Sequence, residues 1–163
     1  MTISVKVGNI VDEVEEGIII QQVNAQGVMG SGVAKDIRDK YPIVWQEYSK
    51  RVGPAYTQQF NGYHLLGMMI PVQVNDNLWV CNIVGQQFFG REPEKQRGGR
   101  YTSYDALANG LWAVKHFALD MFTTHIHFPL IGCGLGGGDW RIVSNLIETQ
   151  RSEEHTSELQ SRS

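Results

Sequence analysis

Two glycine-rich segments, each placed after a strand-like run and before a helix-like stretch, constrain the fold of this chain most strongly. The first reads NAQGVMGSG at residues 24–32 and follows the apolar run 18–23. The second reads GCGLGGG at residues 132–138 and follows the strand-like stretch 125–130. Glycine lets the backbone turn its N–H groups outward, and a helix start adds partial positive charge. Each segment is therefore a candidate anion-binding loop.

Strand-like and helix-like segments alternate along the chain. The alternating residues Ile3, Val5 and Val7 predict a first strand, and the run 18–23 predicts a strand covered on both faces. Apolar periodicity predicts helices over residues 31–41, 42–52, 103–118 and 139–148. Two runs at 63–74 and 78–84, joined by an Asn-Asp-Asn turn, predict a hairpin. This order predicts an α/β sandwich with a mixed sheet, in which ligands bind where strands lead into helices.

Composition limits the kinds of partner. The chain has 163 residues, of which 42% are hydrophobic, so one domain with its own core is expected. Its 14 Lys and Arg against 17 Asp and Glu give a net charge of −3, which argues against binding nucleic acid through bulk positive charge. No apolar run long enough for a membrane span and no signal peptide are visible. We expect a cytoplasmic monomer without a cofactor.

Neither the cysteines nor the histidines predict a metal site. Cys81 and Cys133 are the two cysteines, and they form no C-x-x-C pair, so we expect reduced thiols and no zinc. His125 and His127 share one face of a predicted strand, but no third ligand is evident nearby. Asp139 is expected to cap the last helix, and Trp140 is expected to pack beneath the second glycine segment.

The last 13 residues, RSEEHTSELQSRS, differ in character from the rest. Leu159 is their one large apolar residue, so they predict neither an amphipathic helix nor a half-buried strand. The stretch 151–161 also resembles the translation of a common sequencing-adapter oligonucleotide. We therefore expect a domain over residues 1–150, a non-native or disordered tail over 151–163, and no strand after residue 150.

The second glycine segment alone allows a different interpretation. Gly132, Gly134 and Gly137 fit the G-x-G-x-x-G pattern of a dinucleotide-binding Rossmann site, which would make the chain an NAD oxidoreductase. The acidic residue that such a site carries about 20 positions further on does not follow in native-looking sequence. No glycine segment continues as G-K-[ST], so a Walker A loop is absent.

The two segments together match one family. The stretch IIIQQVNAQGVMGSGVAKDIRDKYP, followed about a hundred residues later by FPLIGCGLGGGDW, resembles the macro domain, which binds ADP-ribose and its derivatives. The resemblance covers residues 3–150 and implies a three-layer α/β sandwich that here lacks its last strand. It implies that Asn24 contacts the distal ribose and that Asn9 and Ile10 face the adenine.

The resemblance also implies which residues surround the rest of the ligand. The diphosphate-binding residues it predicts are Gly30, Ser31, Gly32, Val33 and Ala34 in the first segment, and Ile131, Gly132, Cys133, Gly134, Leu135 and Gly136 in the second. Phe88 or Phe89 could stack on a ring at the pocket mouth, and Tyr101 and Tyr104 could line the distal ribose side.

The IGCGL motif looks most like the branch that includes terminal ADP-ribose glycohydrolases and phage and bacterial proteins that process ADP-ribose 1″-phosphate. Gln86 stands where that branch has a lysine, and Gly136 stands where it has an aspartate. Ala34 and Asn9 replace aspartates that other macro domains carry. The resemblance therefore predicts binding. It leaves open a hydrolase in which Asn24 holds a water and the phosphate of the substrate activates it.

Overall fold

The computed structural model describes residues 7–30, 32–53, 61–89, 100–123, 125–134, 136–152 and 160–162. The strands are β1 (Gly17–Asn24), β2 (Met69–Asn75), β3 (Leu78–Gln86), β4 (His125–His127) and β5 (Gln160–Arg162). The helices are α1 (Ile10–Glu13), α2 (Gly32–Lys40), α3 (Pro42–Arg51), α5 (Tyr104–Asp120) and α6 (Trp140–Ser152), with a 3₁₀ turn, η1, at Tyr63–Leu65.

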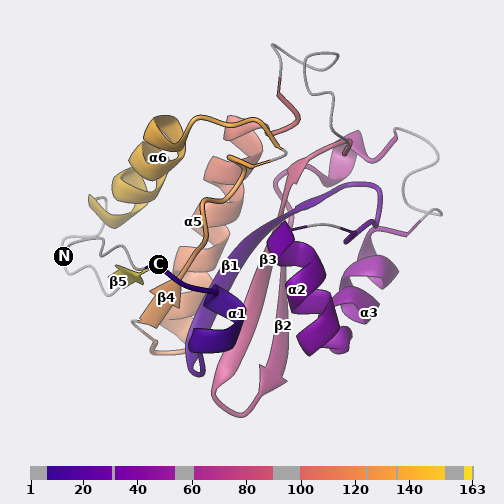
Figure 1. The fold of residues 1–163 in the computed structure, drawn as a ribbon. Helices are drawn as coiled ribbons and strands as arrows, with labels where there is room; N and C mark the ends of the chain where they lie inside the picture. Colours follow the sequence, from indigo (N-terminus) through magenta and orange to yellow (C-terminus); the bar gives the residue numbers. More distant parts are fainter. Residues whose placement is uncertain are drawn as a thin grey trace.

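The strands form one mixed sheet in the order β2-β3-β1-β4-β5. β1 is parallel to both β3 and β4, whereas β2 is antiparallel to β3 through the predicted hairpin (Figure 1). β1 pairs with β3 along its whole length, with Ile19 opposite Val80. The mixed sheet expected from the sequence is confirmed, and its central parallel strands carry their carboxyl ends to the same edge.

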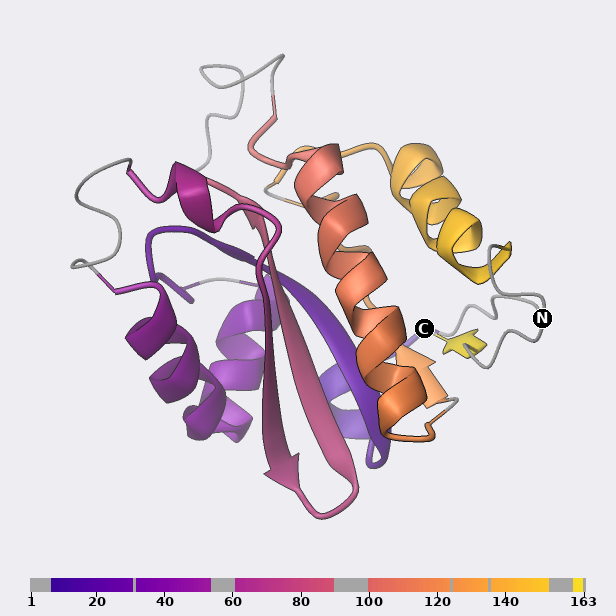
Figure 2. The same cartoon turned by 180° about the vertical axis from the view of Figure 1, so that it is seen from behind.

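Helices cover both faces of this sheet. α1, α2 and α3 lie on one face and α5 and α6 on the other, as the two opposite views show (Figures 1 and 2). Alternation along β1 explains the two layers, because Ile19 and Val23 belong to the core under α1–α3 whereas Ile18 and Ile20 belong to the core under α5 and α6. The chain is therefore the three-layer α/β sandwich that the resemblance implies.

Several element boundaries differ from the prediction. The strand expected over 125–130 ends at His127, because Pro129 has no N–H group for the ladder and restrains Phe128 before it. The run 63–74 begins as the 3₁₀ turn η1 after a left-handed Gly62, so β2 starts only at Met69. The short helix α1, which Asn9 caps, was not predicted. The first predicted strand lies almost wholly outside the described residues.

The prediction that no strand follows residue 150 is wrong. α6 continues to Ser152, and β5 pairs in parallel with all three residues of β4. The edge of β4 presents backbone N–H and C=O groups that pair with an extended segment whatever its side chains are. Apolar patterning, on which the prediction was based, does not detect a strand of this kind.

In the part of the chain that the structure describes, no helix has the length and apolar character needed to cross a lipid bilayer.

Candidate ligand-binding site

Both glycine segments line one cavity of about 730 Å³ where β1 ends. The predicted residues that line it are Asn24, Gly30, Gly32, Val33 and Ala34 from the first segment and Ile131, Gly132, Cys133, Gly134 and Gly136 from the second. Ser31 and Leu135 were also predicted, but they lie outside the described residues. Residues about a hundred positions apart in the sequence thus come together in one site.

A second cavity, of about 900 Å³, adjoins the first. Val33, Pro129 and Leu130 line both, so the two form one continuous groove. Asn9 and Ile10, which the resemblance assigns to the adenine, line this second cavity. The side-chain oxygen of Asn9 already accepts a hydrogen bond from the Val11 N–H at 2.9 Å, which caps α1.

The backbone of the second segment is supported on one side and open on the other. A Cβ atom on Gly136 would clash with the Thr102 hydroxyl oxygen, and one on Gly132, whose φ is +74°, would lie 2.9 Å from the Gln22 Oε1. A Cβ on Gly134 or Gly32 would meet nothing within 4 Å. The segment therefore packs tightly against the protein at Gly132 and Gly136 and leaves its backbone accessible at Gly134.

The start of α2 contributes the opposite wall of the first cavity. α2 begins at Gly32, and Gly32, Val33 and Ala34 all line the cavity. The first four N–H groups of an α-helix have no acceptor within the helix, and the helix dipole places partial positive charge there. Among the described residues that line this cavity, not one side chain is charged. Its attraction for an anion must therefore come from backbone N–H groups.

Asn24 lines the cavity, but most of its amide is bonded within the protein. Its Oδ1 accepts hydrogen bonds from the Gln26 N–H at 2.9 Å and the Val28 N–H at 3.3 Å, and its Nδ2 donates to the Val28 carbonyl at 2.7 Å. These contacts hold the first glycine segment in shape. Among the described contacts, one N–H of the amide remains for a ligand hydroxyl or a water.

The Tyr48 side chain of α3 holds Asn24 and the first glycine segment in place, a role that nothing in its local sequence predicts. Its side chain is fully buried, and its hydroxyl lies 2.6 Å from the Asn24 carbonyl and 2.9 Å from the Asn24 Oδ1. The Gly27 N–H donates to the same hydroxyl at 3.1 Å. Burial raises the pKa of Tyr48 well above its usual range, so the hydroxyl keeps its proton. In the sequence Tyr48 appears only as one apolar position of a helix.

Gln86 occupies the position that the resemblance assigns to a lysine, and it is held in a network of neutral groups. Its Nε2 donates to the Phe88 carbonyl at 2.7 Å, and its Oε1 accepts from the Gln22 Nε2 at 2.6 Å. Gln22 also donates to the Thr102 hydroxyl at 3.0 Å, and that hydroxyl donates to the Gly132 carbonyl at 2.7 Å. The network supports the second glycine segment and contains no acid or base. Neither Gln22 nor Thr102 was predicted as a site residue.

The other candidate reactive groups are not suited to catalysis here. Asp139 caps α6 as predicted, since its Oδ1 accepts from the Arg141 N–H at 2.9 Å, and it is not among the residues that line the cavity. Hydrogen bonds from Arg141 hold the pKa of Asp139 below its usual value. Burial and the charge of Asp139 raise the pKa of the Cys133 thiol, which disfavours a thiolate. Over the described ranges, no three potential ligands gather as a metal site.

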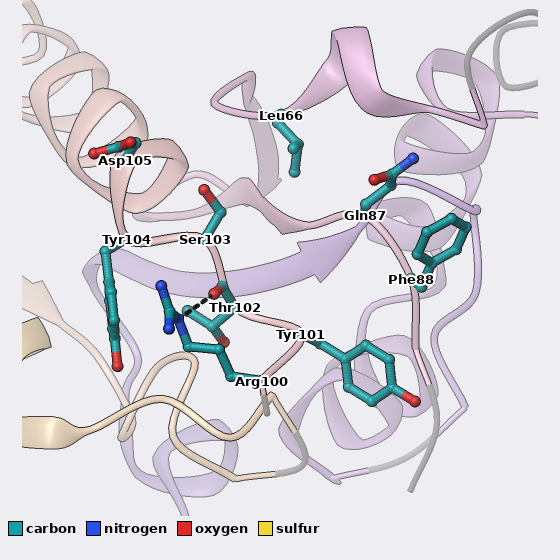
Figure 3. A pocket seen from close by; sticks show the side chains of 9 residues that line it. All are labelled: Leu66, Gln87, Phe88, Arg100, Tyr101, Thr102, Ser103, Tyr104 and Asp105. Carbon is teal, nitrogen blue, oxygen red and sulfur yellow. Dashed lines mark hydrogen bonds between the residues drawn. The ribbon is translucent and has the colours of Figure 1, made fainter. Parts of the chain in front are cut away.

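The aromatic residues that were expected near the ligand lie in two different pockets. Phe89 lines the first cavity and is 50% exposed. Phe88, Tyr101 and Tyr104 instead line a separate pocket of about 220 Å³, so the two tyrosines are not among the described residues lining the cavity beside Asn24 (Figure 3). In that pocket the Arg100 guanidinium lies 4.3 Å from the centre of the Tyr104 ring and donates to the Thr102 carbonyl at 3.0 Å. These contacts hold the entry to α5.

Comparison with known proteins points to one family. The model of the Macro domain family matches residues 20–147. A Thermosipho africanus relative, the DNA ADP-ribosyl transferase–DNA ADP-ribosyl glycohydrolase fusion protein, is 26% identical over 129 residues, which are 77% of this chain and 33% of the relative. The chain thus spans about a third of the length of that relative.

Solved structures show the same fold. A protein from Bacteroides thetaiotaomicron has a TM-score of 0.80 and 26% identity, with 99% of this chain and 96% of that chain covered. Thermosipho africanus DarTG in complex with ADP-ribose has a TM-score of 0.71 and 16% identity, with 98% of this chain and 40% of that chain covered.

Proposed function

This chain belongs to the macro domain family, and on that premise we propose that it binds ADP-ribose or an ADP-ribose derivative in the groove between its two glycine segments. The observation that carries the proposal is the first cavity, where α2 begins at Gly32, the space beside Gly134 is open, and no described lining side chain is charged. Backbone N–H groups at such a helix start hold a diphosphate.

The two cavities suit the two ends of such a ligand. The first offers amide side chains of Asn24, Gln22 and Gln86 in its lining, which suit a sugar rich in hydroxyl groups. The second combines the apolar Ile10, Val14 and Phe128 with carboxylates, which suits a flat base whose exocyclic amine donates hydrogen bonds. The complex of the similar DarTG structure with ADP-ribose supports the same ligand.

Hydrolysis of an ADP-ribose adduct, or of ADP-ribose 1″-phosphate, is the second candidate. The glycohydrolase in the name of the Thermosipho relative favours it. Gln86, Gly136 and Ala34 stand where acid or base side chains occur in other branches, so a water would have to be held by Asn24 and activated by the substrate itself. Without a positioned general base that reaction would be slow. We therefore propose a binding module first, acting as a monomer in a bacterial or phage setting.

The test is calorimetric titration of the full chain with ADP-ribose, NAD and AMP, with melting curves of every sample. We expect ADP-ribose to bind with a roughly micromolar dissociation constant and NAD to bind more weakly. Asn24→Ala should weaken ADP-ribose binding at least about tenfold, since it loosens the first glycine segment. A folded chain that does not bind ADP-ribose would overturn the proposal, and tighter binding of NAD would favour the dinucleotide-binding interpretation.

The same samples decide between binding and hydrolysis. Incubation with ADP-ribose 1″-phosphate, with an ADP-ribosylated peptide and with ADP-ribosylated DNA should leave each substrate intact. Release of phosphate or of free ADP-ribose that Asn24→Ala abolishes would establish the hydrolase instead.

A further inference from the structure

We propose that Arg100 and Tyr104 are positioning residues, which hold the second glycine segment in the geometry that binds a ligand and so raise the affinity for ADP-ribose. Both line the separate pocket of Figure 3, and neither is among the described residues that line the groove. This inference rests on the proposed function, because it concerns how the backbone of that site is held in place. It also gives Tyr104 a different role from the ribose contact that the resemblance implies.

The stretch 100–104 supports the second glycine segment from outside. The Gly136 carbonyl accepts hydrogen bonds from the Tyr101 N–H at 2.8 Å and from the Thr102 N–H at 3.0 Å. The Gly132 carbonyl accepts one from the Thr102 hydroxyl at 2.7 Å. The open backbone between these two glycines therefore depends on the position of this stretch.

Tyr104 connects the end of the segment to the start of α5. Its hydroxyl accepts a hydrogen bond from the Asp139 N–H at 3.0 Å, one residue before α6 begins. Among the described hydrogen bonds of residues 132–139, those that reach beyond residues 130–143 all end in the stretch 100–104. A change in this stretch should therefore be transmitted directly to the segment.

The Arg100 side chain holds the stretch in this bonded conformation. Its Nε donates to the Thr102 carbonyl at 3.0 Å, and its guanidinium lies 4.3 Å from the centre of the Tyr104 ring (Figure 3). A guanidinium is planar, so it can stack on an aromatic ring while its N–H groups donate, whereas a lysine ammonium has no plane to stack. Because both residues lie outside the described lining of the groove, their effect on a ligand passes through the segment.

A less ordered segment weakens binding even when no ligand contact is removed. A ligand binds only those molecules whose segment has the binding geometry, so the apparent affinity falls with the fraction of such molecules. One hydrogen bond or one stacked cation changes an equilibrium constant roughly three- to tenfold. Loss of either contact should therefore weaken ADP-ribose binding by a factor in this range.

Calorimetric titration of the full chain with ADP-ribose tests the inference. Arg100→Lys removes the stack, and Tyr104→Phe keeps the ring but removes the acceptor of the Asp139 N–H, so each should bind about threefold or more weakly. Two controls should bind as the unsubstituted chain does. Arg51→Lys changes an exposed arginine at the end of α3, and Val72→Ala lowers the melting temperature from the core under α1–α3.

A spectroscopic measurement without ligand separates positioning from general destabilisation. In chain labelled with ¹⁵N at glycine, the amide signals of Gly134 and Gly136 should shift or broaden in Arg100→Lys and in Tyr104→Phe. The signals of Gly27 and Gly30 in the first segment should stay unchanged, since the stretch 100–104 makes no described hydrogen bond to them.

The outcomes separate this inference from the proposed function. If the unsubstituted chain binds ADP-ribose and both variants bind it equally well, the positioning role is overturned while the proposed function stands. The same holds if Val72→Ala weakens binding as much at an equal loss of melting temperature. If the folded unsubstituted chain does not bind ADP-ribose, the proposed function itself fails, and the glycine signals still decide whether the stretch holds the segment.

Discussion

At the scale of single residues, Gly132 and Gly134 of the second segment should respond to substitution in opposite ways. Gly134→Val places its side chain in open space at the cavity, so it should leave the melting temperature nearly unchanged and weaken ADP-ribose binding at least about tenfold. Gly132→Ala forces a side chain into a left-handed backbone conformation against Gln22 and Thr102, so it should destabilise the fold by about 1–3 kcal/mol. Melting curves and calorimetry on both variants measure the two effects. Normal affinity in folded Gly134→Val would show that the ligand lies elsewhere.

The glycine segments and Asn24 stand out in the sequence because backbone access and a strand end leave a pattern along the chain, and the structure brings them to one cavity. Their roles toward a ligand stay a prediction. Tyr48 and Thr102 could not be predicted as site residues, because their hydroxyl groups bond to Asn24 and Gly132, which are far away in the sequence. The residues next to them carry no pattern that indicates these contacts. Asn24 shows the opposite case. Its position after a strand predicts a contact with a ligand, but in the structure most of its amide bonds to the first glycine segment.

At the scale of elements, Tyr48 joins α3 to the end of β1 and to the first glycine segment. Tyr48→Phe removes a hydroxyl that bonds the buried Asn24 carbonyl and the partly buried Gly27 N–H, so both groups lose a partner. We expect a loss of about 1–3 kcal/mol in the free energy of unfolding. For a chain of this size, that is a melting temperature several degrees lower. ADP-ribose affinity should fall as well, because the segment that contributes Gly30 and Gly32 is less ordered.

The same tyrosine predicts a pH effect with a definite sign. Because burial raises the pKa of Tyr48 in the folded state, the folded chain holds the proton more tightly than the unfolded chain. Its contribution to stability is complete below the ordinary tyrosine pKa of about 10 and is lost as the pH rises above it. The free energy of unfolding should therefore fall above about pH 10, and less steeply in Tyr48→Phe than in the unsubstituted chain. Denaturant titrations at pH 8 to 11 measure this, and equal slopes would contradict it.

Elements with strong local patterns were predicted, and those set by backbone pairing were not. β1 follows from its apolar run and α5 from its apolar periodicity, and the Ser103 hydroxyl caps α5 by accepting a hydrogen bond from the Ala106 N–H at 3.2 Å. β4 is shorter than its apolar run because Pro129 interrupts the ladder. β5 has no apolar pattern to detect, since it depends on the open edge of β4.

At the scale of the whole molecule, ligand binding in the groove should not depend on the tail, residues 153–163. The described residues that line the two cavities all precede residue 137, and β5 adds three residues at the edge of the sheet. A chain that ends at Ser152 should therefore bind ADP-ribose with unchanged affinity. Its free energy of unfolding should change by less than about 1 kcal/mol, because three edge residues contribute few backbone hydrogen bonds and each is worth little net stability.

Melting curves and calorimetry on the full and the shortened chain measure these two quantities side by side. A shortened chain that unfolds many degrees lower would mean that residues 153–163 stabilise the β4 edge and belong to the domain. Replacing the tail with a glycine-serine segment of equal length distinguishes the causes, because such a segment can still pair through its backbone while it removes every original side chain. Recovery of stability with that segment would assign the effect to strand pairing at β4, and failure to recover would assign it to the tail side chains.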